Sequence, residues 1–193
     1  MRKIIVFNYV SVDGFFAGSS GEMDLFININ KDDEFNAFTH EASKSGGALI
    51  FGRVTYEVME SYWPTADAIK NDPSMAEVMN NIPKIVFSKT LQSVKEGPNW
   101  KNITLFHEIK PQKIVKLKEQ EGKDITILGS GSIIQQLANL DLIDEYQLLI
   151  VPVVLGTGKS LFKNVKKMNL NLLDTRTFRN GIVMLRYQSK KST

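Results

Sequence analysis

The sequence predicts an α/β domain that spans residues 1–193, with a mixed, mostly parallel sheet and antiparallel strands at its C-terminal end. Apolar, β-branched runs alternate with segments of helical periodicity through most of the chain, and the last part reads as consecutive strands. This order is typical of a parallel sheet with an antiparallel edge. A chain of 193 residues with 42% hydrophobic and 23% charged residues suits one buried core.

The first elements follow from apolar runs and from the residues that bound them. Residues 3–10 are apolar and β-branched without helical spacing, and they predict a buried strand. Residues 11–31 predict a long loop, and its embedded aromatic side chains favour a loop that folds over something apolar. Asp32 and Asp33 suit the first turn of a helix that Gly46 ends.

The later elements alternate until about residue 144. Pro111 suits the first position of a helix, because its missing N–H would have no helical partner there. In order, the sequence predicts a strand at 48–51, a helix at 55–62, a loop from Pro64, a helix at 74–80, a strand at 84–87, a loop at 91–101, a strand at 103–106, a helix at 111–122, a strand at 124–128, a helix from Gly131, and strands at 145–151, 169–177 and 182–188.

Composition narrows the class of protein. The net charge of +3 comes from 24 basic and 21 acidic residues that are spread along the chain, so a nucleic-acid partner is not expected. There are no cysteines, which is consistent with a reducing cytoplasm. No stretch approaches the roughly 18 apolar residues that span a membrane. We therefore expect a cytoplasmic protein without membrane or nucleic-acid partners.

Two glycine turns carry the strongest functional signal. Residues 52–55 (Gly-Arg-Val-Thr) and 129–132 (Gly-Ser-Gly-Ser) each connect a predicted strand to a predicted helix. Such a turn aims backbone N–H groups and a positive helix end at one point, which suits a phosphate. The second turn is not the Rossmann fingerprint, since Ile134 stands where the third glycine belongs. Two turns together suggest a dinucleotide, although Gly52 alone is equally explained as a simple turn.

Side chains beside these turns fit the same ligand. Arg53 can meet a phosphate with a fork of donors, and Thr55 can cap the helix that follows. Ser88 and Lys89 stand at the end of the strand at 84–87, where a solvated strand end is the competing explanation. These residues extend the predicted anion-binding edge to a third strand.

The glycine turns, together with Ser-Val-Asp-Gly at 11–14, resemble the dihydrofolate reductase superfamily, particularly its RibD C-terminal branch of riboflavin-biosynthesis reductases. The motifs appear in family order from the first strand to Phe162. The resemblance implies a dihydrofolate-reductase-like three-layer α/β/α sandwich and a homodimer. It also implies NADPH-dependent hydride transfer to a ribosylamino-pyrimidine or a related pyrimidine or pteridine.

The resemblance also implies which residues hold the cofactor. The strand end at Ser88 and Lys89 resembles the family's contact to the adenosine 2′-phosphate, and with Arg53 it favours NADP over NAD. Many members have glycine where Ser130 stands. The implied cofactor residues are Arg53, Thr55, Ser88, Lys89, Gly129, Ser130, Gly131 and Ser132.

On the substrate side, the resemblance implies that Asp13 is the catalytic carboxylate, with Phe16 and Trp63 against the substrate. Ordinary turn chemistry explains an Asp before Gly equally well, and aromatic residues most often pack in a core. True dihydrofolate reductases carry their acid on the next helix, where the register here falls on Asn36, with Asp33 and Glu34 most of a turn earlier. A pteridine reductase using one of those carboxylates, and an NADP-binding sensor without turnover, therefore remain alternatives.

Other motifs give weaker functional signals. Residues 156–160 (Gly-Thr-Gly-Lys-Ser) resemble a P-loop, but Val153 stands at the first glycine position. We interpret this stretch as a mostly structural turn, with a place in the lining of the substrate side as the alternative. The two histidines lack metalloprotease spacing, and no metal site is expected. Both are predicted to lie on the surface or along a helix.

Overall fold

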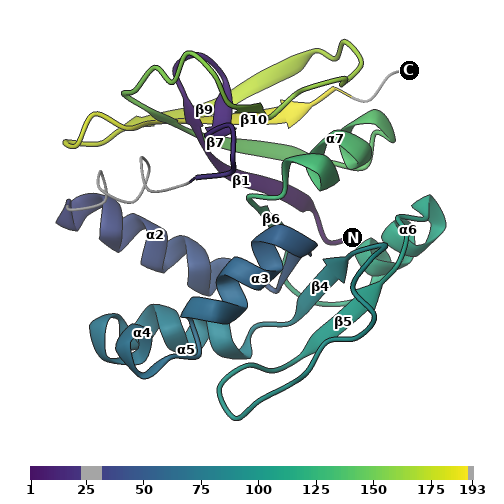
Figure 1. The fold of residues 1–193 in the computed structure, drawn as a ribbon. Coiled ribbons are helices and arrows are strands. Elements are labelled where there is room, and N and C mark those ends of the chain that lie inside the picture. Colours follow the sequence, from purple (N-terminus) through teal and green to yellow (C-terminus); the bar gives the residue numbers. More distant parts are fainter. Residues whose placement is uncertain (23–31, 191–193) are drawn as a thin grey trace.

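The structure is a computed structural model that describes residues 1–22 and 32–190, and an eight-stranded sheet forms its centre (Figure 1). The order of its strands is β5-β4-β3-β6-β1-β7-β10-β9, and a separate pair joins β2 to β8. The strands are β1 (Ile4–Ser11), β2 (Phe15–Ala17), β3 (Ala48–Gly52), β4 (Lys84–Phe87), β5 (Ile103–Phe106), β6 (Ile125–Leu128), β7 (Glu145–Val151), β8 (Lys159–Ser160), β9 (Leu170–Thr177) and β10 (Val183–Ser189).

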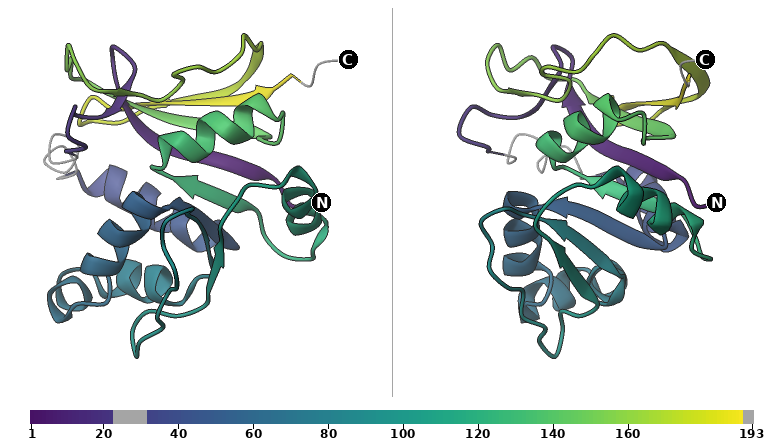
Figure 2. Two further views of the ribbon diagram at one scale, coloured as in Figure 1. Left: turned by 45° about the vertical axis from the view of Figure 1, so that its right-hand side comes forward. Right: turned by 90° about the vertical axis from the view of Figure 1, so that its right-hand side faces the viewer.

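Helices cover both faces of this sheet, which confirms the predicted three-layer α/β/α fold (Figure 2). Helices α6 and α7 bury Ile114 and Leu137 on one face. Helices α2, α3 and α5 bury Phe35, Tyr56 and Met79 on the other. The helices are α2 (Asp33–Ser45), α3 (Arg53–Tyr62), α4 (Ala66–Asn71), α5 (Pro73–Asn81), α6 (Pro111–Glu119) and α7 (Gly131–Asn139).

The mixed sheet agrees with the prediction from the sequence. Strands β5, β4, β3, β6, β1 and β7 pair in parallel, and β10 and β9 add an antiparallel edge. None of the helices within the described residues combines the length and the apolar character that crossing a bilayer requires.

Some predicted boundaries were wrong. The loop predicted from Pro64 contains α4, which Thr65 caps by accepting a hydrogen bond from the Ala68 N–H at 3.2 Å. Helix α3 begins at Arg53 rather than at residue 55, and α6 ends at Glu119. Part of the predicted 11–31 loop is strand β2, and residues 23–31 of that loop lie outside the described residues.

A buried lysine joins three segments at the amino end of β4. Lys84 is 1% exposed, and its Nζ donates to the carbonyl oxygens of Asn80, Ile82 and Lys101 at 2.9–3.1 Å. The same ammonium lies 4.2 Å from the centroid of the Trp100 ring. Burial lowers the pKa of Lys84 to about 8. The three carbonyl groups replace the water that the ammonium loses.

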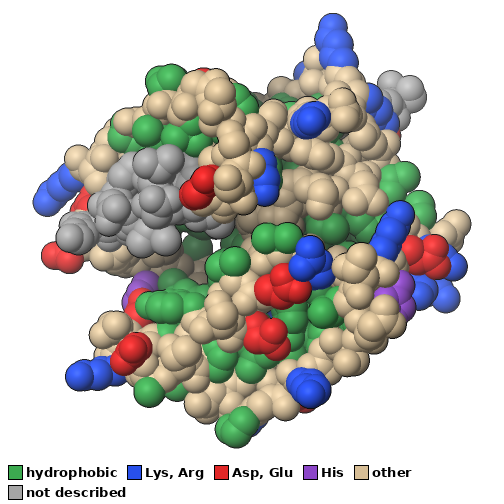
Figure 3. All heavy atoms as spheres, viewed as in Figure 1, with side chains coloured by type: hydrophobic (Ala, Val, Ile, Leu, Met, Phe, Trp, Pro, Cys, Tyr) green, Lys and Arg blue, Asp and Glu red, His purple; other side chains and the backbone are tan. Residues whose placement is uncertain are grey.

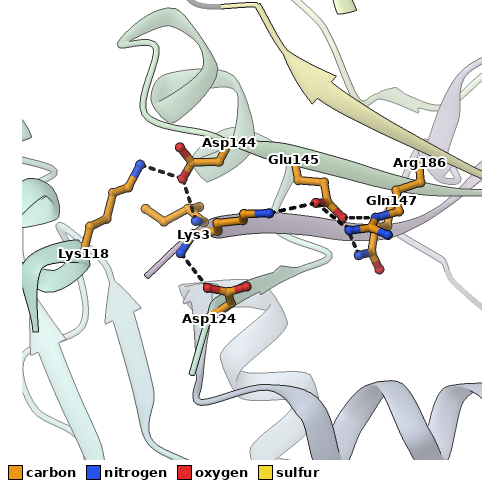
Figure 4. A network of polar contacts seen from close by, with 8 residues as sticks. Lys3, Lys118, Asp124, Asp144, Glu145, Gln147 and Arg186 are labelled. Carbon is orange, nitrogen blue, oxygen red and sulfur yellow. Dashed lines mark hydrogen bonds and ion pairs between the residues drawn. The ribbon is translucent and has the colours of Figure 1, made fainter. Parts of the chain in front are cut away.

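A charged network ties β1, β7 and β10 together (Figure 4). Glu145 on β7 is 2% exposed and accepts hydrogen bonds from Arg186 Nε at 2.6 Å and from Gln147 Nε2 at 2.8 Å. Lys3 Nζ lies 3.8 Å from the same carboxylate. Burial alone would raise the pKa of Glu145, but the hydrogen bonds from Arg186 and Gln147 outweigh it, and the pKa lies below the ordinary value of 4.5.

We predict that Glu145→Gln lowers the free energy of unfolding at pH 7 by about 1–3 kcal/mol, because Arg186 loses its charged acceptor. Since the folded pKa is depressed, the carboxylate contributes stability above about pH 4.5, and this is lost as the pH falls through the folded pKa. Urea unfolding at pH 7 and at about pH 3 checks this, because the gap between wild type and variant should narrow at the lower pH.

The control for this prediction is Asp141→Asn, which breaks the exposed pair between Asp141 and Lys166. Such pairs contribute at most about 1 kcal/mol. A loss at pH 7 no larger than in the control would contradict the role assigned to Glu145.

Candidate functional site

The site forms where the sheet changes the side to which its helices connect. After β3 the chain enters α3 on one face, and after the neighbouring strand β6 it enters α7 on the opposite face. In open α/β sheets such a switch point leaves a crevice outside the carboxyl ends of the strands. Helices α3 and α7 begin at Arg53 and Gly131, and their N-terminal ends therefore point toward one place.

The sheet also opens beside this point. The last residue pair between β1 and β6 is Phe7 with Leu128, whereas β1 continues to Ser11 beside β7 alone. The backbone of Gly129 and Ser130 turns away here in the left-handed region, with φ values of 56° and 55°. Glycine adopts this conformation freely, and for Ser130 the surrounding hydrogen bonds hold it.

Ser130 links the two glycine turns. Its Oγ accepts a hydrogen bond from the Gly52 N–H at 2.9 Å, and its own N–H donates to Thr55 Oγ1 at 3.1 Å. Thr55 thus does not cap α3 as predicted, because Gly52 occupies the capping position and the Thr55 hydroxyl serves the other turn. These two hydrogen bonds fix the turns relative to each other.

A cavity of about 950 Å³, here called cavity 1, opens from these turns (Figure 3 shows this face hollowed). It runs to the carboxyl ends of β4 and β5, where Lys89 and His107 line it. The structure brings together at cavity 1 all eight residues predicted to hold a cofactor: Arg53, Thr55, Ser88, Lys89, Gly129, Ser130, Gly131 and Ser132.

The polar side chains of cavity 1 differ in how far other groups of the protein already occupy them. Arg53 Nη1 donates to both carboxylate oxygens of Glu57, at 2.8 and 3.0 Å, so any anion that approached Arg53 would compete with that carboxylate. Ser88 is buried, and its Oγ accepts from the N–H groups of Thr90 and Leu91, so it shapes the loop after β4. Lys89 is exposed and lies at the cavity wall.

The β2–β8 pair covers one side of the site and brings Phe16 to it. A Cβ added to Gly131 would lie 2.4 Å from a ring carbon of Phe16, so only glycine allows this packing. Phe16 lines cavity 1 and also a second cavity of about 360 Å³, here called cavity 2. Thr55, Met59 and Gly129 line both as well, so the two cavities adjoin.

Cavity 2 lies between the sheet and helices α2, α3 and α5. Trp63, predicted to face a substrate, lines it, as does Asn36. Asp33 and Glu34 do not, because Asp33 points to solvent and Glu34 pairs with Arg176 at 3.2 Å. The face of α2 that meets cavity 2 therefore carries the amide of Asn36 rather than either of these two carboxylates.

Asp13 stands apart from both cavities. Its Oδ1 accepts hydrogen bonds from Ser11 Oγ at 2.6 Å and Leu155 N–H at 3.2 Å, and its Oδ2 accepts one from Gly156 N–H at 2.8 Å. The Ser11 hydroxyl and these backbone donors lower the pKa of Asp13. It lines neither cavity, so the structure does not bring it together with Phe16 and Trp63. Its catalytic role stays a prediction.

The sequence analysis missed polar residues that line the cavities. His107 lines cavity 1, with its Nδ1 3.1 Å from the Ser88 carbonyl oxygen. His40 and Asp72 line cavity 2 and pair at 2.8 Å, and Gln147 lines it from β7. These residues lie far apart in the chain, and no local motif marks them.

We predict that Gly131→Ala lowers the free energy of unfolding by about 1–3 kcal/mol, because the added methyl group must displace Phe16. In an unobstructed helix the same change would stabilise by about 1 kcal/mol. Thermal unfolding measures the difference, with Gly97→Ala as control, since a Cβ there meets nothing within 4 Å. A Gly131→Ala protein as stable as the control would contradict the packing described.

Comparisons with known proteins agree with this architecture. The family model of the RibD C-terminal domain matches residues 2–184. The uncharacterized protein YyaP of Bacillus subtilis is 34% identical over 187 residues, which cover 96% of this chain and 94% of that protein. A second uncharacterized protein of the same organism, YwjB, is 25% identical over 185 residues, or 94% of this chain and 95% of that protein.

Solved structures share the fold. A protein of Shewanella sp. PV-4 named for riboflavin biosynthesis superposes with a TM-score of 0.74 at 24% identity, covering 98% of this chain and all of that one. The Thermotoga maritima diaminohydroxyphosphoribosylaminopyrimidine deaminase/5-amino-6-(5-phosphoribosylamino)uracil reductase gives a TM-score of 0.66 at 12% identity. There the match covers 98% of this chain and 57% of that one.

Proposed function

The chain belongs to the RibD C-terminal domain family, and from that premise we propose that it is an NADPH-dependent reductase of a pyrimidine or related heterocycle. The observation that carries the proposal is the pair of glycine turns at the switch point of the sheet, joined through Ser130. Two helix N-termini converging on one cavity suit a pyrophosphate. Cavity 2 adjoins that cavity and offers room for an acceptor.

The residues of cavity 1 fit a dinucleotide phosphate. Gly52, Gly129 and Gly131 keep the two turns compact, because a Cβ at these positions would lie 3.2 Å from Ile133, 3.1 Å from Thr55 and 2.4 Å from Phe16. Lys89, at the end of β4, would meet a 2′-phosphate. When bound, the dihydronicotinamide supplies a hydride to an electrophilic carbon. The chain's own contribution is to fix that ring against the acceptor, which is worth several orders of magnitude in rate.

Cavity 2 fits a flat, neutral heterocycle. Phe7, Met59 and Trp63 supply apolar walls, and Asn36 and Gln147 supply amide groups. Gln147 Nε2 donates to Glu145, which turns the amide so that its carbonyl oxygen faces away from that carboxylate. Amide groups of this kind match the donors and acceptors along the edge of a pyrimidine.

The test is calorimetric titration with NADPH and NADH. We expect NADPH to bind more tightly than NADH, and Lys89→Ala to weaken NADPH by about tenfold or more, the cost of one charge-assisted hydrogen bond. NADH should be nearly unaffected by that variant, whereas Arg53→Ala should weaken both nucleotides. Lys70→Ala is the matched control, since Lys70 is exposed on α4 and lines neither cavity. Failure of both nucleotides to bind would overturn the proposal.

We further propose that the protein is a homodimer through β9. This edge strand exposes Leu172 and Leu173 by 57% and 46%. An exposed apolar edge invites another chain unless it is covered. Sedimentation velocity should show a dimer, and Leu172→Lys with Leu173→Lys should shift it to monomer. A wild-type monomer at micromolar concentration would contradict this assignment.

A further inference from the structure

Cavity 2 contains a histidine–carboxylate pair that joins helix α2 to the residue that caps the N-terminus of α5. His40 lies on α2, and its Nε2 is 2.8 Å from Asp72 Oδ2. Asp72 is itself held in place, because its Oδ1 caps α5 by accepting a hydrogen bond from the Met75 N–H at 2.9 Å. Both side chains are 33% exposed, so the pair is fixed and still open to a ligand.

This pair is distinguished by what else lines cavity 2. Among the described residues there, the titratable side chains are Tyr9, His40 and Asp72. A phenol ordinarily keeps its proton to about pH 10, whereas imidazole exchanges protons near neutral pH. The carboxylates that the sequence suggested, Asp13, Asp33 and Glu34, line other surfaces. Among the described residues that line cavity 2, His40 is therefore the side chain that we single out as the candidate proton donor.

We propose that His40 donates the proton that the reduction requires, and that Asp72 is a positioning residue for its imidazole. This inference rests on the proposed function. The acceptor's C=N or C=O carbon receives a hydride from the dihydronicotinamide, and the π electrons of that double bond move to its nitrogen or oxygen. That atom takes a proton from imidazolium, which water then restores. The acceptor gains two electrons and two hydrogens, and the nicotinamide is oxidised by two electrons.

The geometry assigns separate tasks to the two ring nitrogens. With the proton on Nε2 directed at Asp72, Nδ1 is the nitrogen that carries the transferable proton in the imidazolium form. Asn36 lies four residues before His40 on α2, so the two side chains are neighbours on one helix face, and both line cavity 2. An acceptor held by Asn36 would thus lie beside the imidazole.

The two histidines of the chain provide a direct test, because His40 lines cavity 2 and His107 lines cavity 1. Ring ¹H–¹⁵N spectra would be recorded with NADPH and with 5,6-diaminouracil as separate probes, and assigned with His40→Gln and His107→Gln. We expect NADPH to shift the His107 signals and 5,6-diaminouracil to shift those of His40.

These outcomes separate the two proposals. If NADPH leaves His107 unmoved, the proposed function itself fails. If NADPH shifts His107 but 5,6-diaminouracil leaves His40 unmoved, the reductase assignment stands and the role of His40 is overturned.

Turnover provides the second arm, with NADPH and 5-amino-6-(5-phosphoribosylamino)uracil. We expect His40→Gln to lower kcat by about 100-fold or more, the usual contribution of a general acid, with KM changed less than about threefold. Asp72→Asn keeps the cap of α5, because Asn caps as well as Asp, but removes the charge, and it should lower kcat about tenfold at constant KM. Equal stability in urea would show that neither effect comes from unfolding.

Glu41→Gln is the matched control, since Glu41 is exposed on α2 next to His40. A His40→Gln enzyme with the kcat of the control would overturn the proposal, and so would a loss confined to KM. Wild-type protein that binds NADPH but does not turn over this substrate would count against the proposed reductase function on which the role of His40 rests.

Discussion

The site depends on the hydrogen bonds that pass through Ser130. The Gly52 N–H is satisfied by the Ser130 hydroxyl, and the Ser130 N–H by Thr55, so two turns that lie 78 residues apart in the chain share one geometry. Each of these two N–H groups is a buried or half-buried donor, and leaving such a donor without a partner away from water costs free energy. The left-handed backbone at Ser130 is the conformation that lets one residue serve both turns.

From this link the arrangement of the two cavities follows. Because α3 and α7 pack on opposite faces of the sheet, neither helix closes the gap outside the carboxyl ends of β3 and β6, and cavity 1 opens there. Because β6 ends while β1 continues, the gap extends toward α2 and meets cavity 2. The positions of both cavities therefore follow from the lengths of the strands and from the faces of the sheet on which α3 and α7 pack.

The sequence predicted those features of the fold that local residue patterns encode. Apolar runs located every strand of the main sheet, and the glycine turns located cavity 1. It missed α4, because six residues are too few to show periodicity, and it missed β2 and β8, whose pairing joins residues about 143 positions apart. It also missed the pairing of His40 with Asp72, since only the packing of α2 against α5 brings them together. In the sequence, Ser130 departs from the glycine that many family members have at this position. In the structure, its hydroxyl accepts the hydrogen bond from the Gly52 N–H.

Phe16 lines both cavities and packs on Gly131, where no side chain fits. An occupant of either cavity that displaced the Phe16 ring would change the affinity of the other cavity for its own occupant. The linkage is reciprocal, so the factor by which one ligand changes the binding of its neighbour is the factor it receives in return. Coupling between the two cavities would thus pass through a single aromatic side chain on a three-residue strand.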